Sequence, residues 1–139
     1  MLKRFRSAAL IAAVAATASI GLASPASAAA PFAPYNGACG SGYSVVNHAD
    51  VALKGTVFIT YNASNGYNCA VAIRRGGSGR IPISVGIKRT NDGDDKYVQE
   101  GGQFLSYAGP VYLRAAGQCI DWYGFIDGRR IHRTGTNCG

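Results

Sequence analysis

The chain has 139 residues, of which 14 are basic and 7 are acidic, so its formal net charge is +7. This length is typical of a single domain. Three of the basic residues, Lys3, Arg4 and Arg6, precede an N-terminal apolar run, and without them the net charge is 7 − 3 = +4. A charge of this size favours weak attraction to anionic surfaces but is too small to indicate a nucleic-acid partner.

The N-terminus has the three parts of a secretory signal peptide. The basic residues are followed by an Ala-rich apolar run over residues 7–23, and then by small residues that end in Ala26, Ser27 and Ala28. The apolar run is too short to span a membrane. We therefore expect residues 1–28 to be removed, with cleavage after Ala28 or Ala30, and the mature protein to be secreted without a membrane anchor.

Short strand-like runs follow the signal peptide. A proline-containing lead-in covers residues 29–34, and we expect one secreted β-domain over residues 35–139. In the runs 56–61 and 69–73, apolar side chains recur at every second position, which is typical of β-strands. Asn65-Gly66 lies between the two runs and predicts the tip of a hairpin.

The clearest strand pattern covers residues 81–88. Ile81, Ile83, Val85 and Ile87 alternate with polar or small residues, so one face of this strand is expected to be buried. Pro82 has no backbone N–H to give to a neighbouring strand. The sequence therefore predicts that this strand begins at a sheet edge or carries a bulge there.

A second strand-and-turn unit follows later in the chain. Residues 109–114 lead through Ala116-Gly117 to Cys119, much as the run 56–61 leads to Cys69, and the pattern predicts a second hairpin. After the signal peptide, no segment keeps an apolar period of about 3.6 residues over two turns. The predicted fold class is all-β, a small antiparallel β-sandwich or flattened barrel cross-linked by two disulfides.

The four cysteines lie beyond the signal peptide and would reach an oxidising compartment. Four cysteines allow three pairings, and the sequence alone does not select one. We prefer Cys39 with Cys69 and Cys119 with Cys138, because this pairing gives each predicted hairpin its own cross-link and ties down both ends of the domain. Paired thiols are not available as nucleophiles.

No catalytic site, metal site or cofactor is expected from the sequence. His48 and His132 are the only histidines, and neither has the spacing of a zinc site or of a catalytic triad. The acidic run 91–95 resembles the start of a calcium loop, but the glutamate that an EF-hand needs at its twelfth position is missing. A hairpin turn with solvated acids explains that run better.

Asp121 is the most interesting single carboxyl group, because it lies between Ile120 and the only tryptophan of the chain. If its two neighbours point inward, Asp121 faces solvent; if Asp121 points inward, it must pair with a cation, for which Arg129 and Arg130 are near in sequence. We favour a structural role, because a glycosidase would need a second carboxyl group at a fixed distance and no partner is evident.

Aromatic and basic residues near the C-terminus form the predicted contact surface. Tyrosine, tryptophan and arginine are enriched at the energetic centres of interfaces, and aromatic rings on a sheet can also stack on sugars. A single tryptophan in a small β-domain is more often buried, so Trp122 could also belong to the core. The predicted surface consists of Tyr112, Arg114, Trp122, Tyr123, Arg129, Arg130 and Arg133.

Several sequence blocks, in one order and with all four cysteines in place, resemble the spore-associated protein A family of actinomycetes. None of the blocks falls within residues 74–102. The blocks are Tyr35 to Tyr43, Val45 to Asn47, Gly55 to Val57, Thr60 to Asn62, Asn68-Cys69, Ser106 to Tyr112 and Cys119 to Trp122.

The resemblance implies a small exported protein found with spores or aerial hyphae, with no catalytic residues to transfer. We therefore expect a secreted, non-catalytic protein that acts by binding or structural association at the spore or cell-wall surface. Its partner would be an anionic polymer or another protein. The alternative is a secreted inhibitor or binder of an extracellular enzyme, which would use loops such as 63–67 or 124–128; a small secreted hydrolase is a third reading.

Overall fold

The computed structural model of the protein describes Gly21 and residues 29–139. Apart from Gly21, the predicted signal peptide lies outside the described residues. Within the described part of the chain, no helix is long and apolar enough to cross a membrane.

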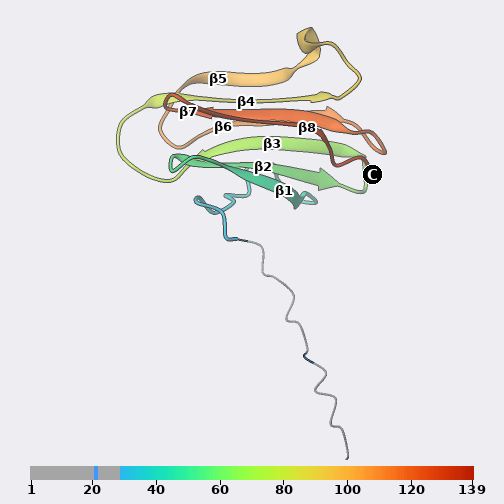
Figure 1. Ribbon diagram of the computed structural model, residues 1–139, viewed down its shortest axis with the longest axis horizontal. Coiled ribbons are helices and arrows are strands. Elements are labelled where there is room, and N and C mark those ends of the chain that lie inside the picture. Colours follow the sequence, from blue (N-terminus) through green and yellow to red (C-terminus); the bar gives the residue numbers. More distant parts are fainter. Residues whose placement is uncertain (1–20, 22–28) are drawn as a thin grey trace, which may run out of the picture.

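Two four-stranded antiparallel sheets pack face to face, with strands that run along the same long direction (Figure 1). Apart from one short 3₁₀ helix, η1 (Asp94–Lys96), the regular structure of residues 29–139 is all strand. The predicted all-β fold class is therefore confirmed, in its sandwich form. Sheet A has the order β1 (Ser44–Val51), β2 (Gly55–Asn62), β3 (Tyr67–Arg74), β6 (Tyr107–Arg114), and sheet B has the order β5 (Val98–Phe104), β4 (Ile81–Arg89), β7 (Ile120–Ile126), β8 (Arg129–Thr136).

The main core lies between the sheets and follows from the period-two patterns of the sequence. The predicted run over β4 places Ile83, Val85 and Ile87 in this core, all at most 1% exposed. They meet Val57 and Ile59 from β2, which are fully buried. Burial of such side chains stabilises the fold by about 1.5–3 kcal/mol each.

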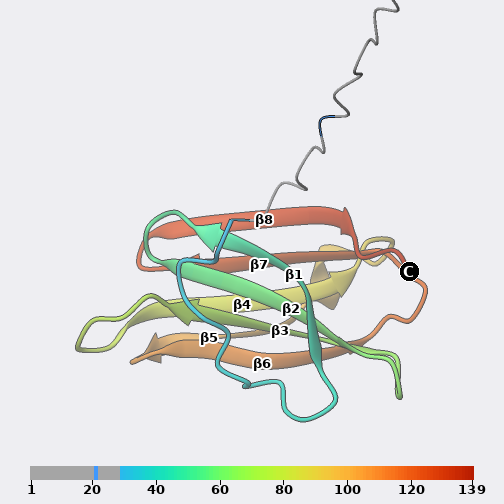
Figure 2. The ribbon, with the colours of Figure 1, turned by 90° about the horizontal axis from the view of Figure 1, so that it is seen from below.

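A second, smaller core covers the outer face of sheet A. The segment that precedes β1 crosses this face (Figure 2), and the Cys39–Cys69 disulfide joins the two. Phe58 and Val71 point outward from the sheet into this cluster. Ala33 is also fully buried there, and its N–H donates to Thr56 Oγ1, so packing begins within the predicted lead-in rather than at Tyr35.

Both preferred disulfides are present. Cys39 pairs with Cys69 and Cys119 pairs with Cys138, with sequence separations of 30 and 19 residues. The first disulfide attaches the N-terminal segment to β3. The second ties the C-terminal segment to the start of β7.

The second predicted hairpin is wrong. β6 pairs with β3 in sheet A, whereas β7 pairs with β4 and β8 in sheet B, so the turn at residues 115–119 carries the chain from one sheet to the other. The first hairpin, β2 with β3, is as predicted, with its tip at residues 63–66. Alternation shows which side chains are buried, but it does not show which sheet the strand joins.

Pro82 occupies a different position from the one predicted. β4 is an internal strand, with β5 on one side and β7 on the other, and no register shift is found along it. The proline is tolerated because the ladder with β7 begins only at Ile83. The carbonyl of Pro82 still accepts a hydrogen bond from the Asp127 N–H, at 2.9 Å.

Candidate contact surface on the outer face of sheet B

Trp122 does not belong to a contact surface. It is fully buried between the sheets, and its indole N–H donates to Thr136 Oγ1 at 2.9 Å. A buried indole needs such a partner, and β8 supplies it. The inclusion of Trp122 among the contact residues was wrong, because its side chain points into the main core.

Tyr112 and Arg114 lie on the opposite side of the molecule from Tyr123, so these residues cannot form one patch. Val111 and Leu113 of β6 face the main core, which turns Tyr112 to the outer face of sheet A. The Tyr112 hydroxyl donates to the Cys39 carbonyl at 3.0 Å. Tyr112 is thus partly occupied in holding the N-terminal segment.

Tyr123 lies on the outer face of sheet B, at a shallow hollow of about 380 Å³. Gly86, its register partner on β4, leaves room for the ring, since a Cβ at that position would overlap the Tyr123 side chain. The Tyr123 hydroxyl donates to Gln99 Oε1 at 2.6 Å. The Tyr97 ring packs edge-on against the Tyr123 ring, with ring centroids 5.3 Å apart. The hollow is lined by Ser84, Asp94, Tyr97, Gln99, Tyr123, Phe125 and Arg130.

Arg130 completes this aromatic group. Its guanidinium carbon lies 4.6 Å from the centroid of the Tyr123 ring, an arrangement that holds the cation through the ring's electron density. Burial raises the pKa of the Tyr123 hydroxyl above its usual range, although the positive charge of Arg130 opposes this. The tyrosine therefore stays neutral at ordinary pH. The charged side chains that line the hollow are Arg130 and Asp94, and Asp94 lies 3.7 Å from Lys88.

The three arginines of β8 face solvent without a counter-ion. Arg129, Arg130 and Arg133 are exposed on an edge strand. Within residues 29–139, no carboxylate forms an ion pair with any of them. We define the contact face as Tyr97, Tyr123, Phe125, Arg129, Arg130 and Arg133. Arg129 and Arg133 pair in register with the inward-facing Ile126 and Trp122, so these two arginines mark its rim.

Sequence reasoning missed Tyr97 and the role of His132 at this face. The Tyr97 hydroxyl and His132 Nε2 are 3.0 Å apart, and the histidine tautomer decides which group donates. This contact joins the segment after η1 to β8. Tyr97 has no strand pattern around it, so only the three-dimensional register could bring it to the site.

Asp121 has the predicted structural role but a different partner. Ile120 and Trp122 point into the core, and yet Asp121, on the outer face, is only 6% exposed. Its carboxylate is 3.1 Å from Lys88 Nζ and accepts hydrogen bonds from Thr90 Oγ1 at 2.7 Å and from the Gly135 N–H at 2.9 Å. Arg129 and Arg130 do not reach it.

The ionisation of this pair follows from its contacts. Burial disfavours the Asp121 carboxylate, but the hydrogen bonds from Thr90, from the Gly135 N–H and from Lys88 outweigh it and hold the pKa below its usual value. For Lys88, burial acts against the charge, whereas the hydrogen bond and the negative charge of Asp121 raise the pKa. Both groups are therefore charged and committed to each other at neutral pH.

The acidic run 91–95 forms a turn that continues into η1. Asp92 pairs with Arg89 at 3.3 Å, and Asp94 lies 3.7 Å from Lys88. Among the residues that the structure describes, no group of three or more histidine, cysteine or carboxylate side chains is placed to hold a metal ion.

Comparison with known proteins gives one clear similarity. The chain is 41% identical over 117 residues to spore-associated protein A of Streptomyces coelicolor, and the matched region covers 84% of this chain and 75% of the Streptomyces protein. No protein-family model and no solved structure matches the chain.

Proposed function

Because this chain belongs to the spore-associated protein A family, we propose that it is exported and associates with the surface of spores or cells. The proposal follows the name of the Streptomyces relative, and the two disulfides are consistent with an oxidising, extracellular location. Association, rather than catalysis, is the proposed activity.

The observation that carries the proposal is the position of Arg130 over Tyr123 with no carboxylate partner in the described part of the chain. Stacking on the ring fixes the guanidinium plane and leaves its N–H groups free to donate. A fixed planar fork of donors matches the oxygens of a phosphate or carboxylate. Arg129 lies beside it on β8 and adds to the positive potential.

This geometry favours an anionic polymer over a neutral sugar at the contact face. Arg130 lies over the Tyr123 ring, so this ring is not free to stack on a sugar. Tyr97 and Phe125 border the hollow and supply partly buried apolar surface around the charge. Phosphate or carboxylate groups spaced along a wall or spore polymer are the proposed ligands, and the net charge of +4 without the signal peptide agrees with them.

A non-enzymatic role is supported by the state of the titratable groups. Asp121 is held by Lys88, Thr90 and the Gly135 N–H, so no free acid or base remains there. His132 contacts Tyr97 but no carboxylate or nucleophile pairs with it in the described residues. For the alternative, an enzyme inhibitor, one of the two presenting loops is absent, because Gly124 to Ile126 belong to β7.

The test is a pull-down with the protein as it is exported. The full chain is expressed in a secreting host, purified from the medium, and mixed with spores, with intact cell walls and with walls stripped of their anionic polymers. We expect the protein to sediment with spores and intact walls at moderate salt and to stay in solution with stripped walls. Absence from every pellet contradicts the proposal.

An inhibition assay in parallel separates the two candidate functions. The same preparation is added to a panel of secreted proteases and amylases, whose rates should not change. Specific inhibition of one of these enzymes, together with no sedimentation, would favour the inhibitor instead.

A further inference from the structure

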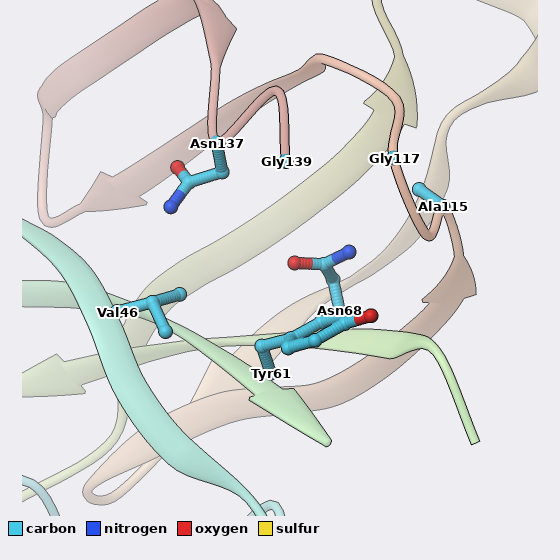
Figure 3. Close-up of a pocket in the computed structure, with 7 residues that line it drawn as sticks. All are labelled: Val46, Tyr61, Asn68, Ala115, Gly117, Asn137 and Gly139. Atoms are coloured by element: carbon cyan, nitrogen blue, oxygen red, sulfur yellow. The ribbon is translucent and has the colours of Figure 1, made fainter. Parts of the chain in front are cut away.

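A second site lies at one end of the sandwich, away from the contact face. It is a pocket of about 300 Å³ between the inner face of sheet A and two turns that close over it (Figure 3). This volume is at the lower end of the range for small-molecule sites. The pocket is lined by Val46, Tyr61, Asn68, Ala115, Gly117, Asn137 and Gly139.

The pocket lies where the inner rows of β2 and β3 meet the segments that follow β6 and β8. Tyr61 follows Val57 and Ile59 on the inner row of β2, and Asn68 is its register partner on β3. On the other side of the sandwich, β8 ends at Thr136 and the chain turns across the opening. The Cys119–Cys138 disulfide holds this C-terminal segment in place, and the Asn47 amide nitrogen donates to Asn137 Oδ1 at 3.0 Å.

Asn68 is the feature that points to a ligand. The residue is only 3% exposed, and no hydrogen-bond partner for its side-chain amide is found within residues 29–139. In the described residues, every side-chain polar atom that is sealed from solvent has a hydrogen-bond partner. Since the Asn68 amide has none, the small exposed area of Asn68 must include this amide. Figure 3 shows this amide rising from β3 into the pocket beside the Tyr61 ring.

The Asn68 amide opens to the pocket, where water can satisfy it, so a ligand that displaces this water must supply its own donor and acceptor. Asn68 offers one donor group and one acceptor. Asn137 accepts from Asn47 through its oxygen, which leaves its amide nitrogen as a second donor. The lining contains no charged side chain. Since its polar side chains are amides, the lining matches a ligand that itself carries a donor and an acceptor.

We infer that this pocket binds the acetamido group of an N-acetylated sugar. An acetamido group presents one N–H and one C=O to the Asn68 amide, and its methyl group fits the apolar surface of Val46 and Ala115. The Tyr61 ring lies beside Asn68, where it can contact a pyranose ring. The inference rests on the lining of this pocket alone, and it stands or falls independently of anion binding at the contact face.

The test is a titration of the ¹⁵N-labelled exported protein, followed through the side-chain amide signals of Asn68. N-acetylglucosamine should shift these signals with saturation in the millimolar range, as expected for a single small ligand. Glucose and glucosamine, which lack the acetyl group, should cause at least about tenfold weaker effects. The same sugar should leave the signals of Tyr123 and Arg130 unchanged.

Variants separate binding from folding. Asn68→Leu keeps the size of the side chain but removes both polar atoms, and it should weaken N-acetylglucosamine binding about tenfold or more. Val46→Arg places a long side chain at the mouth from an exposed position on β1 and should have a similar effect without disturbing the core. Val45→Arg is the matched control, because Val45 pairs with Thr60 and does not line the pocket.

Three results would overturn the inference. They are the absence of a saturable shift at Asn68, equal shifts with glucose, and unchanged binding by the folded Val46→Arg variant. A shift caused by a blocked dipeptide amide and by none of the sugars would assign the pocket to a peptide instead, and would also overturn it.

Discussion

Removal of the Cys39–Cys69 disulfide is the most informative stability experiment, because this bond joins the N-terminal segment to the outer face of sheet A. The proposed variant replaces both cysteines by alanine. The bond closes a loop with a sequence separation of 30 residues. In the chain-entropy description, a loop of this length stabilises the folded state by about 3.7 kcal/mol at 25 °C.

This magnitude is large against the whole stability of a small domain, which is about 5–15 kcal/mol. The smaller core adds to it, because Cys39 and Cys69 are 2% and 0% exposed and pack with Phe58 and Val71. We therefore expect the loss to reach at least about 3 kcal/mol. Urea unfolding of the wild type and the variant, with linear extrapolation to water, measures it.

The second disulfide provides the comparison. The Cys119–Cys138 bond closes a loop with a separation of 19 residues, for which the same description gives about 3.2 kcal/mol. A double alanine variant at this bond should lose nearly as much stability. A loss below about 1 kcal/mol at Cys39–Cys69 would refute the reasoning, since the N-terminal segment would then be held by packing alone.

Two further predictions concern the interior. Folding lowers the pKa of Asp121 from its ordinary value of 3.8. Its contribution to stability is therefore complete above that pH and is lost as the pH falls through the lower folded-state value. Asp121→Asn should therefore be less stable than the wild type at pH 7, and its stability should fall less below about pH 4 when urea unfolding is measured across this range. An unchanged pH profile for Asp121→Asn would contradict the assigned pair. Gly124→Ala should cost about 1–3 kcal/mol, because its Cβ would overlap Val57 Cγ2 between the sheets; the exposed Gly101→Ala should cost less, and equal thermal shifts for the two would contradict this packing.

The parts of the fold that depend on local signals were predictable. Asn65-Gly66 identified the β2–β3 hairpin because a tight turn fixes the register of both neighbouring strands. The alternating isoleucines identified β4 and its buried face. The preferred disulfides are also confirmed, although one of the arguments for them, a second hairpin ending at Cys119, was wrong.

The parts that depend on long-range register were not predictable. Lys88 is one of the polar residues that alternate with the isoleucines of β4. Nothing in the sequence indicated that the pairing of β4 with β7 would place it opposite Asp121. The same limit explains the division of the predicted contact residues. Tyr112 and Tyr123 both alternate with buried neighbours, but they belong to different sheets and face opposite directions.

The candidate sites show the limit most clearly. Tyr97 and Gln99 reach the contact face only through the pairing of β5 with β4, and they lie in the stretch that carries no block of the family resemblance. Asn68 precedes Cys69 and belongs to one of these blocks. The sequence does not show that its amide faces a pocket, because the turns that close this pocket are distant in the chain.

The measurement that tests the central claim most directly is the affinity of Arg130→Gln for spores or isolated cell walls, compared with Arg114→Gln. Both substitutions remove one positive charge from an exposed side chain, but Arg130 lies on the contact face and Arg114 on β6 of the opposite sheet. We expect Arg130→Gln to bind several-fold more weakly and with a smaller dependence on salt, and Arg114→Gln to bind as the wild type does. Equal affinities for the two variants would contradict an anion-binding role for the outer face of sheet B.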